Sequence, residues 1–241
     1  MRIRLRFTKL GKVRWTSHRD AARLWERALR RAQVPLAYTE GFSPRPKVSF
    51  GLALPTGAES DAEYLDVNVR PERDVDLSTL PDRLTAGLPS GMACTAAVGL
   101  DPPVSSLQQV VTSCSWVLGA RVPAAEAERR VSELLAADSV PFSRVRKGKE
   151  TTDDLRPAVR ELAVVGNHYT EGFVALRAEL ATQPRAVKPI ELLAALWPSS
   201  GDDVAGWPLR RTHQWIGPSD AGVEPITLDA PEESYAPARA S

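Results

Sequence analysis

Apolar and charged residues alternate at the start of the chain and then change to a helical spacing. Ile3, Leu5 and Phe7 alternate with arginines, which is the period-two pattern of a strand with one buried face. After a turn at Gly11, residues 13–15 are expected to resume extended structure. Thr16, Ser17 and Asp20 are side chains suited to capping a helix, and the apolar pattern of helical spacing after them predicts a helix that runs to about Gln33.

The same two periodicities recur along the rest of the chain. Strands are expected at 36–38, 48–54, 64–69, 93–98, 110–118, 140–145, 162–165, 173–180 and 210–216, and helices at 77–88, 124–137 and 189–196. Asp101-Pro102-Pro103 is typical of a linker between two halves of similar order.

Two successive strand-helix-strand-strand-helix-strand orders predict an α+β protein made of two tandem ferredoxin-like (βαββαβ) sandwiches. We expect a basic first subdomain over 1–102 and a second subdomain over 103–217. Residues 218–241 are rich in Pro, Ala and Glu, and this composition predicts a disordered C-terminal tail.

Charge is distributed unevenly between the halves. Residues 1–50 contain thirteen Lys and Arg against three Asp and Glu, a local net charge of +10, whereas the whole chain has a net charge of only +1. A compact positive region attracts polyanions. A solvated face that pairs with the acidic remainder of the same chain would account for the same numbers.

Arginines repeat along the predicted first helix, and a proline-stiffened loop follows it. The loop, residues 41–47, presents Phe42 among cations, and single-stranded nucleic acid requires an aromatic ring for base stacking and cations for phosphate. Alternatively, Phe42 fills the core and the arginines are a solvated helix face. The candidate phosphate-binding residues are Arg14, Arg19, Arg23, Arg27, Arg30, Arg45 and Lys47.

His18 stands where the first strand passes into the first helix, two residues before Asp20. A histidine there could serve as a general base for attack by an RNA 2′-hydroxyl, as a metal ligand or as a phosphate contact, and we name His18 and Asp20 as candidate catalytic residues. Alternatively, His18 caps the helix or packs on Trp15. We expect no metal site, because the other histidines are distant and no carboxylate has a diagnostic spacing.

A second basic cluster occurs in the other half, around a predicted hairpin tip at Gly148. Its candidate anion-binding residues are Arg146, Lys147, Lys149 and Arg156. If the halves face each other, the two clusters would line one cleft.

Several sequence blocks resemble a bacterial family of uncharacterised radical-SAM-associated proteins, in which the domain stands alone or is fused to the end of a cobalamin-type radical SAM protein. The blocks are Phe7-Thr8-Lys9, Val13–Asp20, Arg27–Ala32, Gly41–Pro46, Ser49-Phe50-Gly51, Glu63-Tyr64, Asp66, Lys147-Gly148-Lys149, Leu155-Arg156-Pro157 and Lys188–Leu193. The resemblance implies a radical SAM protein as partner. The two cysteines, Cys94 and Cys114, cannot bind an iron–sulfur cluster, so this chain is not the radical SAM enzyme itself.

Together these features predict a cytoplasmic, non-catalytic accessory or substrate-presenting partner of a radical SAM enzyme. It would bind structured RNA (tRNA or rRNA) and need no cofactor of its own, and no membrane span is expected. Two alternatives stay open: a metal-independent ribonuclease that uses His18, and a protein-docking module that binds no nucleic acid.

Overall fold

A computed structural model describes residues 1–70, 73–100, 105–146, 149–168, 170–217 and 222–226. The described part is a mixed α+β structure whose strand pairs are mostly antiparallel, which confirms the predicted class. It divides into two compact units: residues 1–111 with 210–217 and 222–226, and residues 112–209. The expectation of two tandem ferredoxin-like sandwiches stays a prediction.

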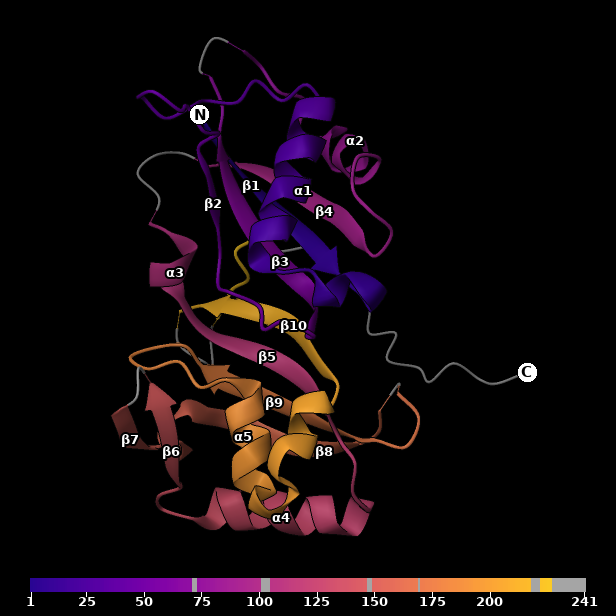
Figure 1. Cartoon of the computed structure of the whole chain (residues 1–241), viewed down its shortest axis with the longest axis vertical. Helices are drawn as coiled ribbons and strands as arrows, with labels where there is room; N and C mark the ends of the chain where they lie inside the picture. Colours follow the sequence, from indigo (N-terminus) through magenta and orange to yellow (C-terminus); the bar gives the residue numbers. More distant parts are fainter. Residues whose placement is uncertain (71–72, 101–104, 147–148, 169, 218–221, 227–241) are drawn as a thin grey trace, which may run out of the picture. The chain divides into compact units, whose positions relative to one another are not determined.

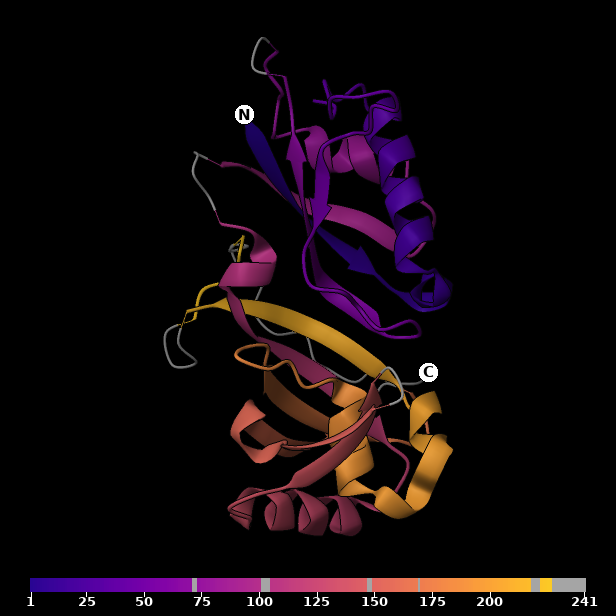
Figure 2. The ribbon, with the colours of Figure 1, turned by 60° about the vertical axis from the view of Figure 1, so that its left-hand side comes forward.

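Unit 1 is a sheet with two helices on one face (Figures 1 and 2). Its strands pair in the order β4-β1-β3-β10, and β2 also pairs with β3. The elements are β1 (Arg2–Lys9), the 3-10 helix η1 (Gly11–Trp15), α1 (His18–Arg31), β2 (Val48–Phe50), β3 (Glu59–Asn68), α2 (Leu80–Thr85), β4 (Met92–Leu100), α3 (Leu107–Val110) and β10 (Leu209–Ile216).

Helix α1 begins and ends close to the predicted residues, for reasons that its sequence supplies. The Ser17 hydroxyl caps the first turn by accepting a hydrogen bond from the backbone N–H of Asp20 at 3.2 Å. At the other end, Gln33 adopts a left-handed φ of 55°. The backbone N–H of Val34 then donates to the carbonyl of Leu29 at 3.0 Å, closing a Schellman motif. The helix therefore ends before Pro35.

The apolar face of α1 packs on the sheet. Trp25 is completely buried, and its ring lies 4.7 Å from that of Phe7 in β1. This cluster also contains the apolar side chains that alternate along β1 and β3. The arginines of α1 consequently point away from the core.

Two predictions about extended structure in unit 1 were wrong. Residues 11–15 form a 3-10 helix, because Gly11 turns the chain with a φ of 65°. Residues 36–38 contribute only isolated bridges, Leu36 with Val69 and Tyr38 with Pro46. Pro35 precedes this segment and Pro46 is the bridge partner of Tyr38, and a proline provides no N–H for a longer ladder.

Unit 2 contains a three-stranded antiparallel sheet in the order β5-β9-β8 and a separate hairpin, β6-β7. Apart from β7 and the two 3-10 helices, η2 and η3, which were not predicted, its elements lie within a few residues of the predicted ranges. They are β5 (Val111–Ala120), α4 (Ala124–Ala136), β6 (Pro141–Arg146), β7 (Lys149–Asp154), η2 (Arg156–Ala158), β8 (Val159–Asn167), β9 (Val174–Ala181), α5 (Pro189–Leu196) and η3 (Pro198–Gly206).

The last strand was assigned to the second half by sequence, whereas β10 runs parallel to the start of β3 in unit 1. Charged side chains account for this pairing. Arg210 donates two hydrogen bonds of 2.6 Å to Asp61, and Arg211 donates one of 3.1 Å to Glu63. Complementary charges at these positions favour pairing of β10 with β3.

The predicted linker, residues 101–103, and most of the predicted tail lie outside the described residues. Across the described part of the chain, every helix is too short or too polar to cross a membrane.

Candidate nucleic-acid interface

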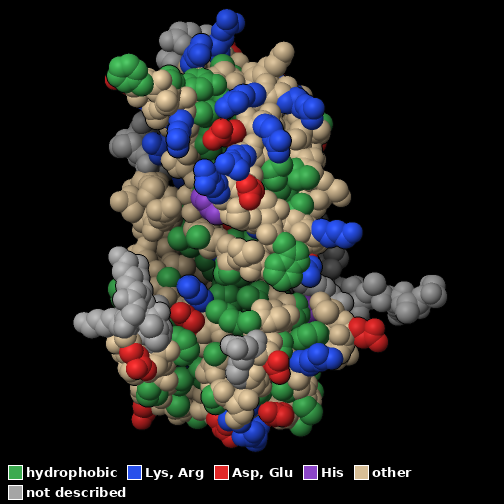
Figure 3. Space-filling model, in the orientation of Figure 1, with side chains coloured by type: hydrophobic (Ala, Val, Ile, Leu, Met, Phe, Trp, Pro, Cys, Tyr) green, Lys and Arg blue, Asp and Glu red, His purple; other side chains and the backbone are tan. Residues whose placement is uncertain are grey.

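The solvent-facing side of α1 is a basic surface. Lys and Arg side chains gather over this part of unit 1 in the space-filling view (Figure 3). We call this surface the arginine face. It consists of the exposed residues Arg19, Arg23, Arg27, Arg30 and Arg31.

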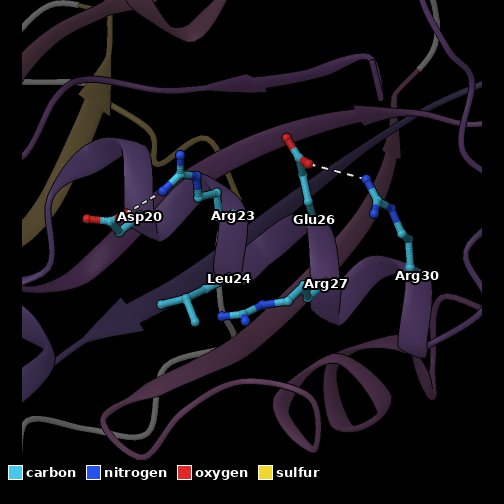
Figure 4. A pocket seen from close by; sticks show the side chains of 6 residues that line it. All are labelled: Asp20, Arg23, Leu24, Glu26, Arg27 and Arg30. Atoms are coloured by element: carbon cyan, nitrogen blue, oxygen red, sulfur yellow. Dashed lines mark hydrogen bonds and ion pairs between the residues drawn. The ribbon is translucent and has the colours of Figure 1, made fainter. Parts of the chain in front are cut away.

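Part of the arginine face borders a surface hollow of about 480 Å³, which Figure 4 shows from close by. Arg23 Nη1 lies 3.2 Å from Asp20 Oδ1, and Arg30 Nη2 lies 3.4 Å from Glu26 Oε2. Arg27 has no acidic partner among the described residues and lies beside Leu24 (Figure 4). The predicted arginine stripe is therefore present, but two of its members already form exposed ion pairs.

The loop after α1 exposes its aromatic residue. Its base is closed by hydrogen bonds from the backbone N–H of Thr39 to the carbonyl of Arg45 and from Lys47 to Ala37, at 2.9 and 2.8 Å. Phe42 is fully exposed, at 111% of its reference area, and Arg45 and Lys47 are exposed as well. The alternative in which Phe42 fills the core is wrong, because the closed base holds the loop tip away from the sheet.

His18 lies at the opposite end of α1 from this loop (Figures 1 and 2). A helix of α1's length spans about 20 Å, so the structure does not bring His18 and Phe42 together. The His18 ring is exposed and meets the Phe50 ring edge-on, with 5.1 Å between centroids. Asp20 hydrogen-bonds Ser17 and Arg23. Ser17, not His18, therefore caps the helix.

Sequence reasoning missed a second exposed aromatic residue, at the His18 end of α1. Trp15 is 61% exposed, and the Arg14 guanidinium lies 5.3 Å from its ring centroid. Arg14 is also 3.6 Å from Glu59 in β3. Arg14 next to Trp15 was the sequence feature that could have indicated this site. It was overlooked because residues 13–15 were expected to form extended structure.

Three buried charged residues, Lys9, Glu63 and Arg211, lie near the start of α1, and the sequence did not predict that they meet. Glu63 accepts a hydrogen bond from Arg211 at 3.1 Å, and Arg211 also donates to the carbonyls of Leu52 and Ala53. Burial raises the pKa of Glu63, while Arg211, Ser60, Lys9 and His18 oppose that rise. Burial lowers the pKa of Lys9, and Glu63 opposes that change. Arg211 could not be recognised as a partner because it lies 148 residues away.

The predicted basic cluster of unit 2 is only partly described. Lys147 and the side chains of Arg146 and Lys149 lie outside the described residues; the backbone of the latter two pairs at the end of the β6-β7 hairpin. Arg156 is half-buried and donates to the carbonyls of Val159 and Leu135, each at 3.2 Å. Both terminal nitrogens of Arg156 thus bind backbone carbonyls, and an anion-binding role for this residue stays a prediction.

Comparison with known proteins places the chain in a family without assigning an activity. No curated protein matches the chain. Residues 2–189 match a family described as uncharacterised proteins conserved in bacteria, DUF2344. The match includes the arginine face, Trp15, His18 and the Phe42 loop, and it ends before β10. Since this match covers more than three quarters of the sequence, the chain belongs to the bacterial family DUF2344.

Proposed function

We propose that the chain binds structured RNA, of the tRNA or rRNA kind, through the arginine face. The observation that carries the proposal is that α1 exposes five arginines, for which the described residues supply only two acidic partners, Asp20 and Glu26. Guanidinium groups bind phosphate oxygens through planar, paired hydrogen bonds.

The two ion pairs on the arginine face do not oppose this function. Their side chains are 38–61% exposed, and exposed pairs of this kind contribute only about 0.2–1 kcal/mol. A phosphate can therefore replace either carboxylate at small cost. The exposed Phe42, with Arg45 and Lys47 in the same loop, supports a further contact at the C-terminal end of α1.

We further propose that the chain acts as a non-catalytic, cytoplasmic accessory of a radical SAM enzyme. The support for this context is the resemblance of its sequence blocks to radical-SAM-associated proteins. A ferredoxin-like unit 1 belongs to the same proposal, and the strand order β4-β1-β3 with β2 on β3 supports it. Cys94 and Cys114 are both buried thiols, as suits a reducing compartment.

The test is titration of the full chain with labelled tRNA at two salt concentrations. If Arg23, Arg27 and Arg30 each bind one phosphate, affinity should fall roughly 40-fold between about 50 and 200 mM salt. Arg27→Ala should reduce that dependence to roughly 12-fold. The matched control is Arg129→Ala, which removes an exposed helical arginine from unit 2 and should leave the salt dependence unchanged.

Other results would replace the proposal. An absence of tRNA binding, or binding that is independent of salt, would remove RNA as the ligand. RNA cleavage that His18→Ala abolishes would make the chain a ribonuclease. If a radical SAM protein co-purifies without RNA and Arg23→Glu with Arg27→Glu abolishes the association, the chain is a protein-docking module.

A further inference from the structure

The exposed Trp15 indole is held more firmly than a surface side chain requires. Lys9 is 5% exposed, and its ammonium group donates to the carbonyl of Arg14 at 3.3 Å and to that of Thr16 at 2.8 Å. A buried lysine thus fixes the backbone on both sides of Trp15. Because lysine burial costs free energy unless the ammonium is hydrogen-bonded, this arrangement stabilises one backbone position for the indole.

The segment around Trp15 is also hydrogen-bonded to β3 and to the loop that precedes β3. The backbone N–H of Gly11 donates to Glu59 Oε1 at 2.7 Å, and that of Gly57 donates to the Arg14 carbonyl at 2.9 Å. Gly57 has a φ of 89°, and a Cβ at this position would lie 2.7 Å from Cζ3 of Trp15. The loop therefore contacts the indole directly, and only glycine allows that approach.

A fixed, exposed indole beside cations suits one class of ligand. The Arg14 guanidinium lies over the ring, while Arg19 and Arg23 are exposed on the first two turns of α1, which begins three residues after Trp15. A nucleobase stacks on an aromatic face while its phosphates bind neighbouring arginines. Since the backbone around the ring is already ordered, little conformational entropy remains to be lost on binding.

We propose that Trp15 is a stacking platform for an unpaired base, so that the RNA recognised by the arginine face has a single-stranded segment at the N-terminal end of α1. This inference rests on the proposed function and specifies its substrate. An isolated exposed aromatic residue is common on protein surfaces, whereas the backbone at Trp15 is held by a buried lysine and its ring lies against Gly57.

The experiment uses the full chain with two fluorescein-labelled probes, a twelve-nucleotide single-stranded RNA and a blunt RNA duplex of the same length. Trp15→Ala should weaken binding of the single strand roughly tenfold, since stacking on one aromatic side chain is typically worth this much. Binding of the duplex should change less than about twofold, because its bases are already stacked. Trp15→Phe retains a ring and should restore most of the affinity.

Direct stacking has a further signature. Tryptophan fluorescence of the wild type should be quenched by the single strand, and Trp15→Phe should lose that component while still binding the probe. The other tryptophans are present in both proteins and provide the internal reference. Because Trp15 is largely exposed, the variants are expected to fold, which a comparison of thermal unfolding verifies.

The outcomes separate the two proposals. If Arg27→Ala weakens RNA binding but Trp15→Ala does not, the stacking platform is wrong and the proposed function stands. Equal losses for the single strand and the duplex, or equal losses for Trp15→Ala and Trp15→Phe, also overturn the platform. If the wild type binds neither probe nor tRNA, the proposed function fails as well.

Discussion

The buried ion pair between Arg4 and Asp66 provides a sharp test of the packing of unit 1. The guanidinium donates two hydrogen bonds to the carboxylate, at 2.8 and 3.0 Å, and joins neighbouring positions of β1 and β3. The side chains are 3% and 8% exposed. Asp66→Ala would leave the Arg4 charge buried without its carboxylate.

Removing one member of a buried pair typically costs about 3–5 kcal/mol. The equilibrium for opening the β1–β3 ladder should therefore rise roughly 10²- to 10⁴-fold. Replacing both members, as in Arg4→Met with Asp66→Leu, should restore most of the stability, because well-packed apolar side chains of similar volume often substitute for a buried pair without loss.

Native-state hydrogen exchange of the full chain measures this opening without assuming that both units unfold together. Peptides from Arg2–Lys9 and Glu59–Asn68 should exchange faster in Asp66→Ala. The control is Glu133→Ala, which breaks an exposed pair with Arg129 in α4 and should change exchange less than about fivefold. The reasoning is refuted if Asp66→Ala is as mild as this control, or if the double variant is no more stable than Asp66→Ala.

Three further predictions concern other buried sites. Because the pKa of Glu63 is raised in the folded state, the folded protein retains this proton more tightly than the unfolded chain. The free energy of unfolding should therefore fall as pH rises above the ordinary value of 4.5 toward the raised pKa. Urea unfolding followed between about pH 4 and pH 7 should show this dependence on pH, and Glu63→Gln should flatten it. An unchanged dependence in Glu63→Gln contradicts the prediction. Burial raises the pKa of Cys94 to about 12, so a thiol reagent at about pH 8 should label it only after denaturation, whereas rapid labelling of the native protein would show that the thiol is accessible. Gly119→Ala would place a methyl group against the Pro208 ring in unit 2 and should cost about 1–3 kcal/mol of unfolding free energy by denaturant titration; a neutral result would mean that this contact relaxes freely.

Local patterns were sufficient for most of the secondary structure. Helix α5 occupies the predicted residues, Pro189–Leu196, because its N-terminal proline and apolar spacing lie within the helix itself. Helix α4 begins at the predicted Ala124 and differs by one residue at its end. The arginine face followed from the same reasoning, since burial of Trp25 on one side of α1 requires the arginines to lie on the other.

The sequence by itself therefore determined the α+β class, the principal helices and strands, and the presence of a basic helix face, all of which depend on residues a few positions apart. Tertiary structure alone decided that β10 pairs with β3 and that Glu63 meets Arg211. It also decided that Trp15 is exposed, with Lys9 bound to the backbone beside it and Gly57 against its ring. These arrangements depend on contacts between residues far apart in the sequence, such as Glu63 and Arg211, which are 148 positions apart, and no local periodicity encodes such contacts.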